Sequence, residues 1–300
     1  MNNDVEYIKL SNLQTSHSSH QKLADLYHNI HNFKGSTLLL DFKGVTFISA
    51  NQFSVLGCII SGFHFKNPDV EIKIGNISPK LAAIMKVNGF GKHLSYDSLP
   101  DKNNTAIPYK IFDVSEIDKF EKYITISIFN RDDLPKMSSG VRDCMIDNIL
   151  EIFNNVKEHT HSKKLYTCGQ FFPSKGLLYF TITDSGETIP YNVENYCQKY
   201  NINLAEFESS LAWAMQSGNS TRQSGSPGGL GLFLLSDFID LNQGELYIVS
   251  GYETFEQTRR GKRYQQLSSP FPGTIVTMAF NLSDSSSYCL ASEKTINIIL

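Results

Sequence analysis

Apolar and polar positions in the first third of the chain follow the periods of alternating strands and helices. Residues 37–40 form a short apolar run, Thr-Leu-Leu-Leu, of the kind that buried strands show. Apolar side chains then recur at helical spacing over residues 51–63, and residues 70–76 alternate between apolar and polar. A further helix is predicted over residues 78–90. This order of strand, helix, strand and helix indicates an α/β unit.

The helix predicted over residues 78–90 carries local start and stop signals. Ser78 suits the N-cap position, because its hydroxyl can accept a hydrogen bond from an N–H group of the first turn. Pro79 suits the first helical position, and Gly89 stands where a C-cap is expected.

The pattern is interrupted at residues 97–108, a polar segment with two prolines that is typical of a linker or a long loop. We therefore divide the chain into a first domain of residues 1–100 and a second domain of residues 108–300.

Asn203 and Glu206 have the spacing of a capping box and predict the start of a helix. The second domain is predicted to contain strands at residues 109–115, 123–130, 177–183, 244–251 and 273–280, and helices at residues 138–159, 203–216 and 230–240.

The helix predicted over residues 138–159 has two different faces. Glu151, Asn155 and His159 are four residues apart and share one face, which is polar. A solvated surface is the more common explanation for such a face taken alone. The opposite face is an apolar stripe of Ile146, Ile149, Leu150, Phe153 and Val156.

Two glycine motifs accompany this helix. Residues 184–190, Asp-Ser-Gly-Glu-Thr-Ile-Pro, directly follow a predicted strand, so the Asp184 carboxylate could accept a hydrogen bond from the amino group of a base. Residues 226–232, Ser-Pro-Gly-Gly-Leu-Gly-Leu, open a predicted helix. Glycines there allow the backbone to approach phosphates, and the start of a helix supplies N–H groups and positive potential. Each motif is weak alone, because turns of both kinds are common.

In this order, the three motifs resemble the ATP-binding fold shared by gyrase, heat-shock chaperones, mismatch-repair ATPases and histidine kinases (GHKL type). The resemblance covers residues 110–282, and the phrase FNNVKEH is most similar to the anti-sigma serine kinases. It implies an α/β sandwich with helices layered on a mixed sheet. The chain as a whole is therefore expected to be α+β.

The resemblance also implies roles for single residues. Glu151 corresponds to the general base that polarises a water or a hydroxyl, Asn155 to the residue that ligates Mg²⁺, and Asp184 to the aspartate that binds adenine. ATP and Mg²⁺ are the implied cofactors. The other nucleotide-binding positions are His159, Gly186, Ile189, Gly229, Gly231, Leu232 and Thr274.

The second domain departs from the family in two respects. Thr188 replaces the second glycine of the Asp-x-Gly-x-Gly motif, and we expect it to restrict the backbone and narrow the pocket. Arg222 is the one arginine in the predicted lid between Tyr191 and Gly228. No helix with a phosphoacceptor histidine precedes the domain, which argues against a sensor histidine kinase.

The first domain resembles a STAS domain, the fold of anti-sigma factor antagonists, over residues 35–95. In that family a partner kinase phosphorylates a serine at the start of a helix. The matching position here is Ala50, and Ser49 occupies the place of the family's aspartate. The resemblance therefore implies the fold and a protein-binding role without the phosphoswitch.

Composition excludes several classes of function. The net charge of −3 and pI of about 6.2 give no electrostatic attraction for nucleic acid or anionic membranes. The basic run of residues 259–263 is best explained as a solvated hairpin tip. Five scattered cysteines without CxxC spacing indicate free thiols in a reducing compartment, and no stretch is long and apolar enough to span a bilayer. We expect a cytoplasmic protein.

Together these features predict an ATP-binding regulatory protein. Mg-ATP would be held by the helix of residues 146–160, by Asp184 and by a lid over residues 217–231. The activity would be ATP hydrolysis or transfer to a serine or threonine of another protein. The alternative is a nucleotide-gated protein-binding module with little or no turnover. The expected partners are a nucleotide and a regulatory protein, and a homodimer is left open.

Overall fold

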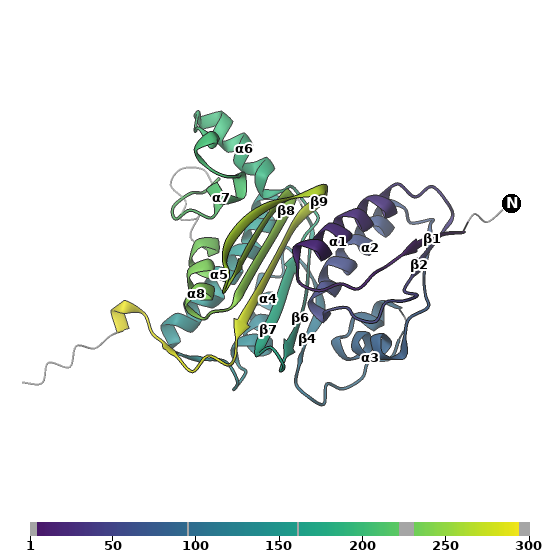
Figure 1. Cartoon of the computed structure of the whole chain (residues 1–300), viewed down its shortest axis with the longest axis horizontal. Coiled ribbons are helices and arrows are strands. Elements are labelled where there is room, and N and C mark those ends of the chain that lie inside the picture. Colours follow the sequence, from purple (N-terminus) through teal and green to yellow (C-terminus); the bar gives the residue numbers. More distant parts are fainter. Residues whose placement is uncertain (1–4, 95, 161, 222–230, 294–300) are drawn as a thin grey trace, which may run out of the picture.

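The computed structural model describes residues 5–94, 96–160, 162–221 and 231–293 (Figure 1). Strands and helices alternate along the chain, and the fold is mixed α+β. The elements are β1 (Val5–Lys9), α1 (His17–His31), β2 (Thr37–Asp41), η1 (Ala50–Gln52), α2 (Phe53–Lys66), β3 (Glu71–Gly75), α3 (Pro79–Asn88), η2 (Phe90–Leu94), β4 (Ala106–Asp113), α4 (Ile117–Ile124), η3 (Thr125–Phe129), β5 (Lys136–Met137), α5 (Ser139–His159), β6 (Lys164–Phe172), β7 (Leu177–Thr183), α6 (Ile189–Tyr200), η4 (Leu204–Glu206), α7 (Ser210–Ala214), α8 (Gly231–Leu241), β8 (Glu245–Thr258), β9 (Gly261–Asn281), β10 (Ser287–Tyr288) and η5 (Ala291–Glu293).

Two sheets organise the molecule. The small sheet has the order β1-β2-β3 with parallel pairing, and the large sheet has the order β4-β6-β7-β9-β8. Every neighbouring pair of the large sheet is antiparallel, so the expectation of a mixed sheet is wrong. The connections explain two of the four pairs, because short turns join β6 to β7 and β8 to β9, and a short turn can only join antiparallel strands.

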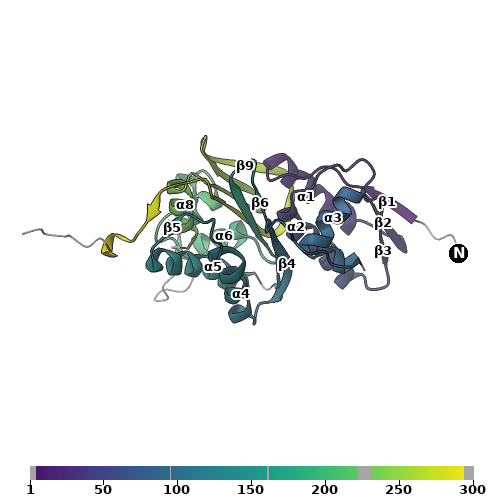
Figure 2. The same cartoon turned by 90° about the horizontal axis from the view of Figure 1, so that it is seen from below.

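The elements stack as successive layers (Figures 1 and 2). The small sheet lies at one end of the molecule and is followed by α1 and α2. These two helices cover one face of the large sheet, while α4, α5 and α8 cover its other face. The large sheet is therefore enclosed between helices that come from the two halves of the chain.

The local signals of the first half are confirmed. The apolar runs predicted as strands form β2 and β3, and the helical pattern between them forms α2. Ser78 caps α3 by accepting a hydrogen bond from the N–H of Leu81, and Pro79 opens the helix. Gly89 ends α3 in the left-handed region at φ 84°. The capping residues thus define this helix as predicted.

The strand predicted at residues 123–130 is wrong, because this segment is helical and forms the end of α4 and the π-helical turn η3. Its isoleucines alternate as in a strand. The buried positions are nevertheless Tyr123, Ile124, Ile128 and Phe129, whereas Ile126 is 56% exposed. Helical spacing places the buried four on one side, and packing against α5 decides between the two periods.

The helix predicted over residues 203–216 is also only partly present. Asn203 accepts a hydrogen bond from the N–H of Ala205, but this cap opens the short turn η4 and not a long helix. The helix α7 begins later, and Ser209 caps it by accepting from the N–H of Ala212. The capping box therefore marks a single turn.

The remaining helices and strands predicted in the second half are present, as α5, α8 and the strands of the large sheet. The basic run of residues 259–263 spans the turn between β8 and β9 and is exposed, as expected of a hairpin tip. All five cysteines are free. Within the residues that the structure describes, no helix combines the length and apolar character needed to cross a membrane.

One apolar core extends from the first half of the chain to the outer face of the large sheet. It contains Leu23 and Phe53 from α1 and α2 together with Phe271 and Ile275 from β9. Polar contacts reinforce this interface, because the Gln21 side chain accepts from the N–H of Ser268 at 2.7 Å. The two sheets separate near the predicted domain boundary, yet they share this core.

Candidate functional site

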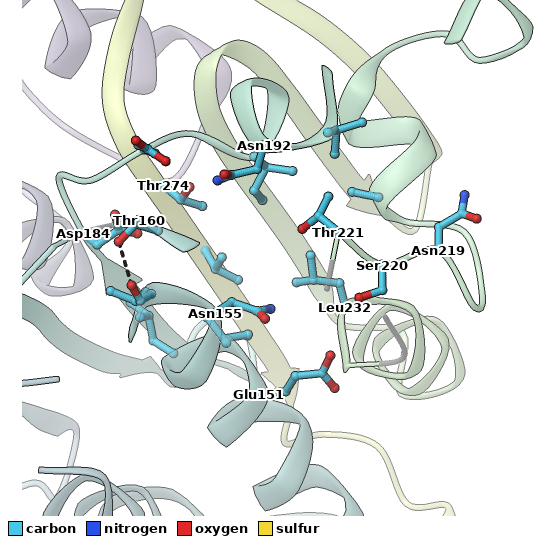
Figure 3. Close-up of a pocket in the computed structure, with 18 of the residues that line it drawn as sticks. Glu151, Asn155, Thr160, Asp184, Asn192, Asn219, Ser220, Thr221, Leu232 and Thr274 are labelled. Carbon is cyan, nitrogen blue, oxygen red and sulfur yellow. Dashed lines mark hydrogen bonds between the residues drawn. The ribbon is translucent and has the colours of Figure 1, made fainter. Parts of the chain in front are cut away.

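A pocket opens on the face of the large sheet that α1 and α2 do not cover (Figure 3). It lies among α5, α6, α7, the start of α8 and strands β7 and β9. It encloses about 870 Å³, part of which is open to solvent. The side chains around it are Glu151, Ile152, Asn155, Val156, Thr160, Ile182, Asp184, Glu187, Ile189, Asn192, Val193, Trp213, Ala214, Asn219, Ser220, Thr221, Leu232, Thr274 and Val276.

Helix α5 presents Glu151 and Asn155 to the pocket. The helix begins at the cap of Ser138, which accepts a hydrogen bond from the N–H of Val141. Its apolar stripe packs on the large sheet, where Ile149 and Phe153 are fully buried. Burial of this stripe fixes the rotation of the helix and turns its polar face toward the pocket. Figure 3 shows Glu151 and Asn155 on successive turns.

Asp184 stands at the far end of the pocket from Glu151, immediately after β7 (Figure 3). Its side chain is only 2% exposed. One carboxylate oxygen accepts a hydrogen bond from the N–H of Gly186 at 2.8 Å. Burial raises the pKa of Asp184 to about 7, although hydrogen bonds from Gly186, Thr274 and Thr160 oppose the rise. The carboxylate can therefore change its charge near neutral pH.

The turn after Asp184 depends on close backbone contacts. A Cβ atom on Gly186 would lie 2.1 Å from the carbonyl oxygen of Thr160, and the N–H of Glu187 donates to that same oxygen at 2.8 Å. On the other side, Gly273 has φ 93°, and a Cβ atom there would lie 2.3 Å from the carbonyl oxygen of Asp184. Both glycines are therefore required for the turn to approach its neighbours.

Ser250 connects two sides of the pocket and has no counterpart in the predicted site. Its hydroxyl lies 2.8 Å from the Thr274 hydroxyl and accepts from the N–H of Ile189 at 2.8 Å. It thereby holds the start of α6 beside β9. No local signal indicated this role, because Ser250 occupies an ordinary position in a strand.

Thr188 differs from its expected role. Its φ of −85° is ordinary for any residue, and its side chain does not line the pocket. The hydroxyl instead caps α6 by accepting from the N–H of Tyr191. The expectation that Thr188 narrows the pocket is therefore wrong, since the residue begins a helix where the family motif has a second glycine.

The structure brings most of the predicted site residues to this pocket. Gly186 packs against Thr160 in the turn after Asp184. Gly231, the first residue of α8, lies against Glu151, and a Cβ atom on Gly231 would be 2.6 Å from the Glu151 carboxylate. The His159 side chain and Gly229 lie outside the described residues, as does Arg222. The predicted residues that line the pocket are Glu151, Asn155, Asp184, Ile189, Leu232 and Thr274.

Several lining residues were not predicted. Trp213 and Ala214 come from α7, and Asn192 and Val193 come from α6. Val193 and Trp213 share a small buried cluster that joins these two helices. The Ser209 cap is the local signal that could have located α7, but nothing near Trp213 indicates that its helix turns back onto the sheet.

The chemistry of the two ends of the pocket differs. Near Asp184 the wall is mainly apolar, with Ile182, Val276 and Ile189 around one buried carboxylate. Such a wall suits a flat ring with one hydrogen-bond donor. Near Glu151 and Asn155 the pocket offers oxygen atoms of a carboxylate and an amide. Such oxygen atoms can ligate Mg²⁺, together with water and phosphate oxygens.

A protein cage for a metal ion is absent from the part of the chain that the structure describes, where no three His, Cys, Asp or Glu side chains converge. Asn155 would therefore hold Mg²⁺ only together with the phosphates of a ligand, and this is how Mg²⁺ commonly binds beside nucleotides. The amide of Asn155 fits that arrangement.

No protein-family model matches the chain, and no curated protein matches it.

Proposed function

We propose that this pocket binds Mg-ATP and that the chain is an ATP-dependent regulatory protein of the GHKL type. The observation that supports the proposal most directly is the convergence of Glu151, Asn155 and Asp184, which are up to 33 positions apart in the sequence, on one pocket (Figure 3). The apolar end accommodates the base, and the polar end accommodates the phosphates and the metal ion.

The base end supports adenine as the ring. The Asp184 carboxylate would accept the hydrogen bond of an exocyclic amino group, and Ile182 and Val276, which pair on β7 and β9, would pack against one face of the ring. A base that presents a carbonyl at the same place would face the ionised carboxylate without a donor between them. The site therefore discriminates against such a base, because an unpaired buried acceptor is unfavourable.

The phosphate end supports a reaction at the terminal phosphate. Glu151 lines the pocket beside Asn155, and Gly231 allows the start of α8 to lie directly against the Glu151 carboxylate. In this role Glu151 takes a proton from the attacking water or hydroxyl, while Asn155 orients the metal ion that neutralises charge on the phosphates. The products would be ADP with phosphate, or ADP with a phosphorylated partner protein.

A second candidate is a nucleotide-gated binding module with little turnover. It is favoured by the environment of Ser49 and Ala50, which are 5% and 2% exposed and lie under the large sheet. The N–H of Ala50 donates to the Gln170 side chain at 3.1 Å. The first half of the chain therefore does not present an acceptor to a kinase site, and its contact with the sheet serves as a fixed support.

Equilibrium binding of a fluorescent ATP analogue with Mg²⁺ tests the proposal. Asp184→Ala is expected to abolish binding while the protein remains folded. Asp237→Ala provides a matched control, because Asp237 is an exposed carboxylate on α8 outside the pocket. Affinity of the Asp184→Ala protein within twofold of the original would remove Asp184 from the site, and equal losses in both variants would point to a general effect of charge.

A further inference from the structure

On the side away from the pocket, the turn that carries Asp184 packs against residues of the first half of the chain. Helix α2 crosses the outer face of the large sheet behind β7 (Figure 1). Ser54 and Cys58 are four residues apart on α2 and therefore share one face of this helix. Both are buried, with exposures of 0% and 2%.

These two side chains contact the residues on either side of Asp184. The Ser54 hydroxyl lies 3.2 Å from the Thr183 hydroxyl, in a buried contact. Burial raises the pKa of the Cys58 thiol, the Asp184 charge raises it further, and a hydrogen bond with the Ser185 side chain opposes the rise. Residues 183 and 185 are thus both held from α2, and Asp184 lies between them.

Cys58 also lines a second cavity. A cleft of about 490 Å³, including its mouth, lies between α1, α2 and β9, and both Cys58 and Ser185 line it. Asp184 itself does not reach this cleft. The Cys58 side chain therefore borders both this cleft and the turn that carries Asp184.

We infer that Cys58, with Ser54, is a positioning residue for Asp184, so that the first half of the chain forms the rear wall of the base pocket. If the pocket binds ATP as proposed, the consequence is that docking of α2 on the sheet sets the affinity for the base. This consequence rests on the proposed function. Without the wall, water from the cleft would solvate the carboxylate, and the turn would lose a support.

The charged groups around Asp184 do not provide this control themselves. Among the described residues, Glu187 and Glu151 line the same pocket as Asp184, with Glu151 at its opposite end, and His31 and Lys66 line the cleft beside Cys58. The groups that bond to Asp184 are uncharged, and burial is the largest influence on its pKa. Exclusion of water is therefore the property that the wall controls.

Cys58→Ala tests the inference, with Cys168→Ala as a matched control. Cys168 is likewise a buried free thiol of the same core, but it lies on β6 and its thiol donates to the carbonyl oxygen of Ile107. Both variants create a similar cavity and are expected to lose similar stability. Only Cys58→Ala should let water reach Asp184 and lower its pKa, by about one pH unit.

Two measurements separate this inference from the proposed function. Carbon-13 NMR follows the titration of the Asp184 carboxyl without nucleotide, and binding of the ATP analogue across pH follows its consequence. Failure of the unaltered protein to bind the analogue would overturn the proposed function, while the NMR titration would still test the wall. A midpoint in Cys58→Ala equal to that in Cys168→Ala would overturn the inference, even if ATP binds.

The contact through Ser54 is tested by a double-mutant cycle on nucleotide affinity. Ser54→Ala and Thr183→Val are each expected to weaken binding about two- to tenfold, as the loss of one buried hydrogen bond does. The affinity of the double variant for nucleotide should be no lower than that of the single variant with the lower affinity, because both substitutions remove the same contact. Fully multiplicative losses would show that Ser54 does not act on the turn through Thr183.

Discussion

Gly186 and Thr160 pack backbone against backbone, so that a Cβ atom on Gly186 would stand 2.1 Å from the Thr160 carbonyl oxygen. The contact joins the turn after Asp184 to the end of α5, the helix that carries Glu151 and Asn155. The two ends of the pocket are therefore held in register by a contact that tolerates no side chain.

Replacement of Gly186 by alanine is expected to weaken both folding and nucleotide binding. The backbone of Thr160 cannot move aside as a flexible side chain could, so we expect a loss of about 1–3 kcal/mol in the free energy of unfolding. Chemical denaturation measures it. Gly62→Ala is the control, because this helical glycine has open space around it and alanine should stabilise α2 by up to about 1 kcal/mol. Equal effects of the two substitutions would contradict the prediction.

Asp184→Asn is expected to remove ATP binding and yet stabilise the protein at alkaline pH. Burial raises the pKa of Asp184 from 3.8 to about 7. The folded protein therefore holds a proton that the unfolded chain releases, and this contribution to stability is present below pH 3.8 and lost as pH rises through 7. Above that pH the buried charge costs up to about 4 kcal/mol, at about 1.4 kcal/mol for each pKa unit.

The measurement is thermal unfolding of both proteins at about pH 8 and pH 5. The advantage of Asp184→Asn should be largest at the higher pH and shrink at the lower one. For the same reason, affinity of the original protein for the ATP analogue should rise as pH increases through about 7, since the ionised carboxylate is the acceptor. A pH-independent affinity would count against a base contact at Asp184.

His20 is expected to make the fold sensitive to acid. Burial, with a smaller contribution from His17, lowers the pKa of His20 from 6.5 to about 4, and its Nε2 atom has no hydrogen-bond partner. The unfolded chain binds the proton first, so stability is complete above pH 6.5 and is lost as pH falls toward 4. The loss from His20 between about pH 7.5 and pH 5 should be about 2 kcal/mol.

Denaturation of the His20→Leu variant beside the original protein isolates this effect, because Asp184 contributes equally to both. The difference in unfolding free energy between the two proteins should change by about 2 kcal/mol over this pH range. A difference that stays constant with pH would mean that His20 has the same pKa in the folded protein as in the unfolded chain.

Glu151→Gln is expected to leave nucleotide binding intact and to reduce phosphate release by about 100-fold or more, since a general base contributes this much. Asp147→Asn is the control, because Asp147 is an exposed carboxylate one turn earlier on α5 and outside the pocket. Phosphate release by purified protein is the assay. If the unaltered protein binds the analogue but neither releases phosphate nor labels a partner protein, it is a binding module.

Ser49 is expected to remain unmodified in the presence of labelled ATP. Its side chain is 5% exposed, and Ala50, at the position of the family's acceptor, has no hydroxyl. Peptide mapping after incubation locates any label. Label on Ser49 would require the first half of the chain to leave the sheet and would restore a self-contained phosphoswitch. Label on an added partner protein would identify a kinase.

Local chemistry explains which elements could be predicted. Ser78, Pro79 and Gly89 act within their own helix, and the apolar stripe of α5 reports directly on its buried face. Strand β6 escaped prediction because both of its faces are buried, so its apolar and polar residues do not alternate. Helix α1 escaped because only a few of its residues are apolar and its buried face also holds Ser19 and His20.

The pocket residues that could be predicted are those that lie within recognisable sequence motifs. Glu151, Asn155 and Asp184 stand in segments whose order along the chain is informative. Ser250 and Trp213 could not be predicted, because their positions depend on how β8 and α7 pack against elements far away in the sequence. The same holds for Cys58, whose contact with the Asp184 turn joins positions that no local pattern connects.

The core shared by α1, α2 and the outer face of the large sheet determines how the two halves of the chain can influence each other. Swinging the first half away would leave Phe271 and Ile275 in water, and at about 25 cal/mol for each Å² of apolar surface this separation is strongly opposed. We therefore expect the two halves to unfold together in one cooperative transition. A change on one face of the large sheet would therefore reach the other face through small displacements of its strands, and not through a hinge motion between the two halves.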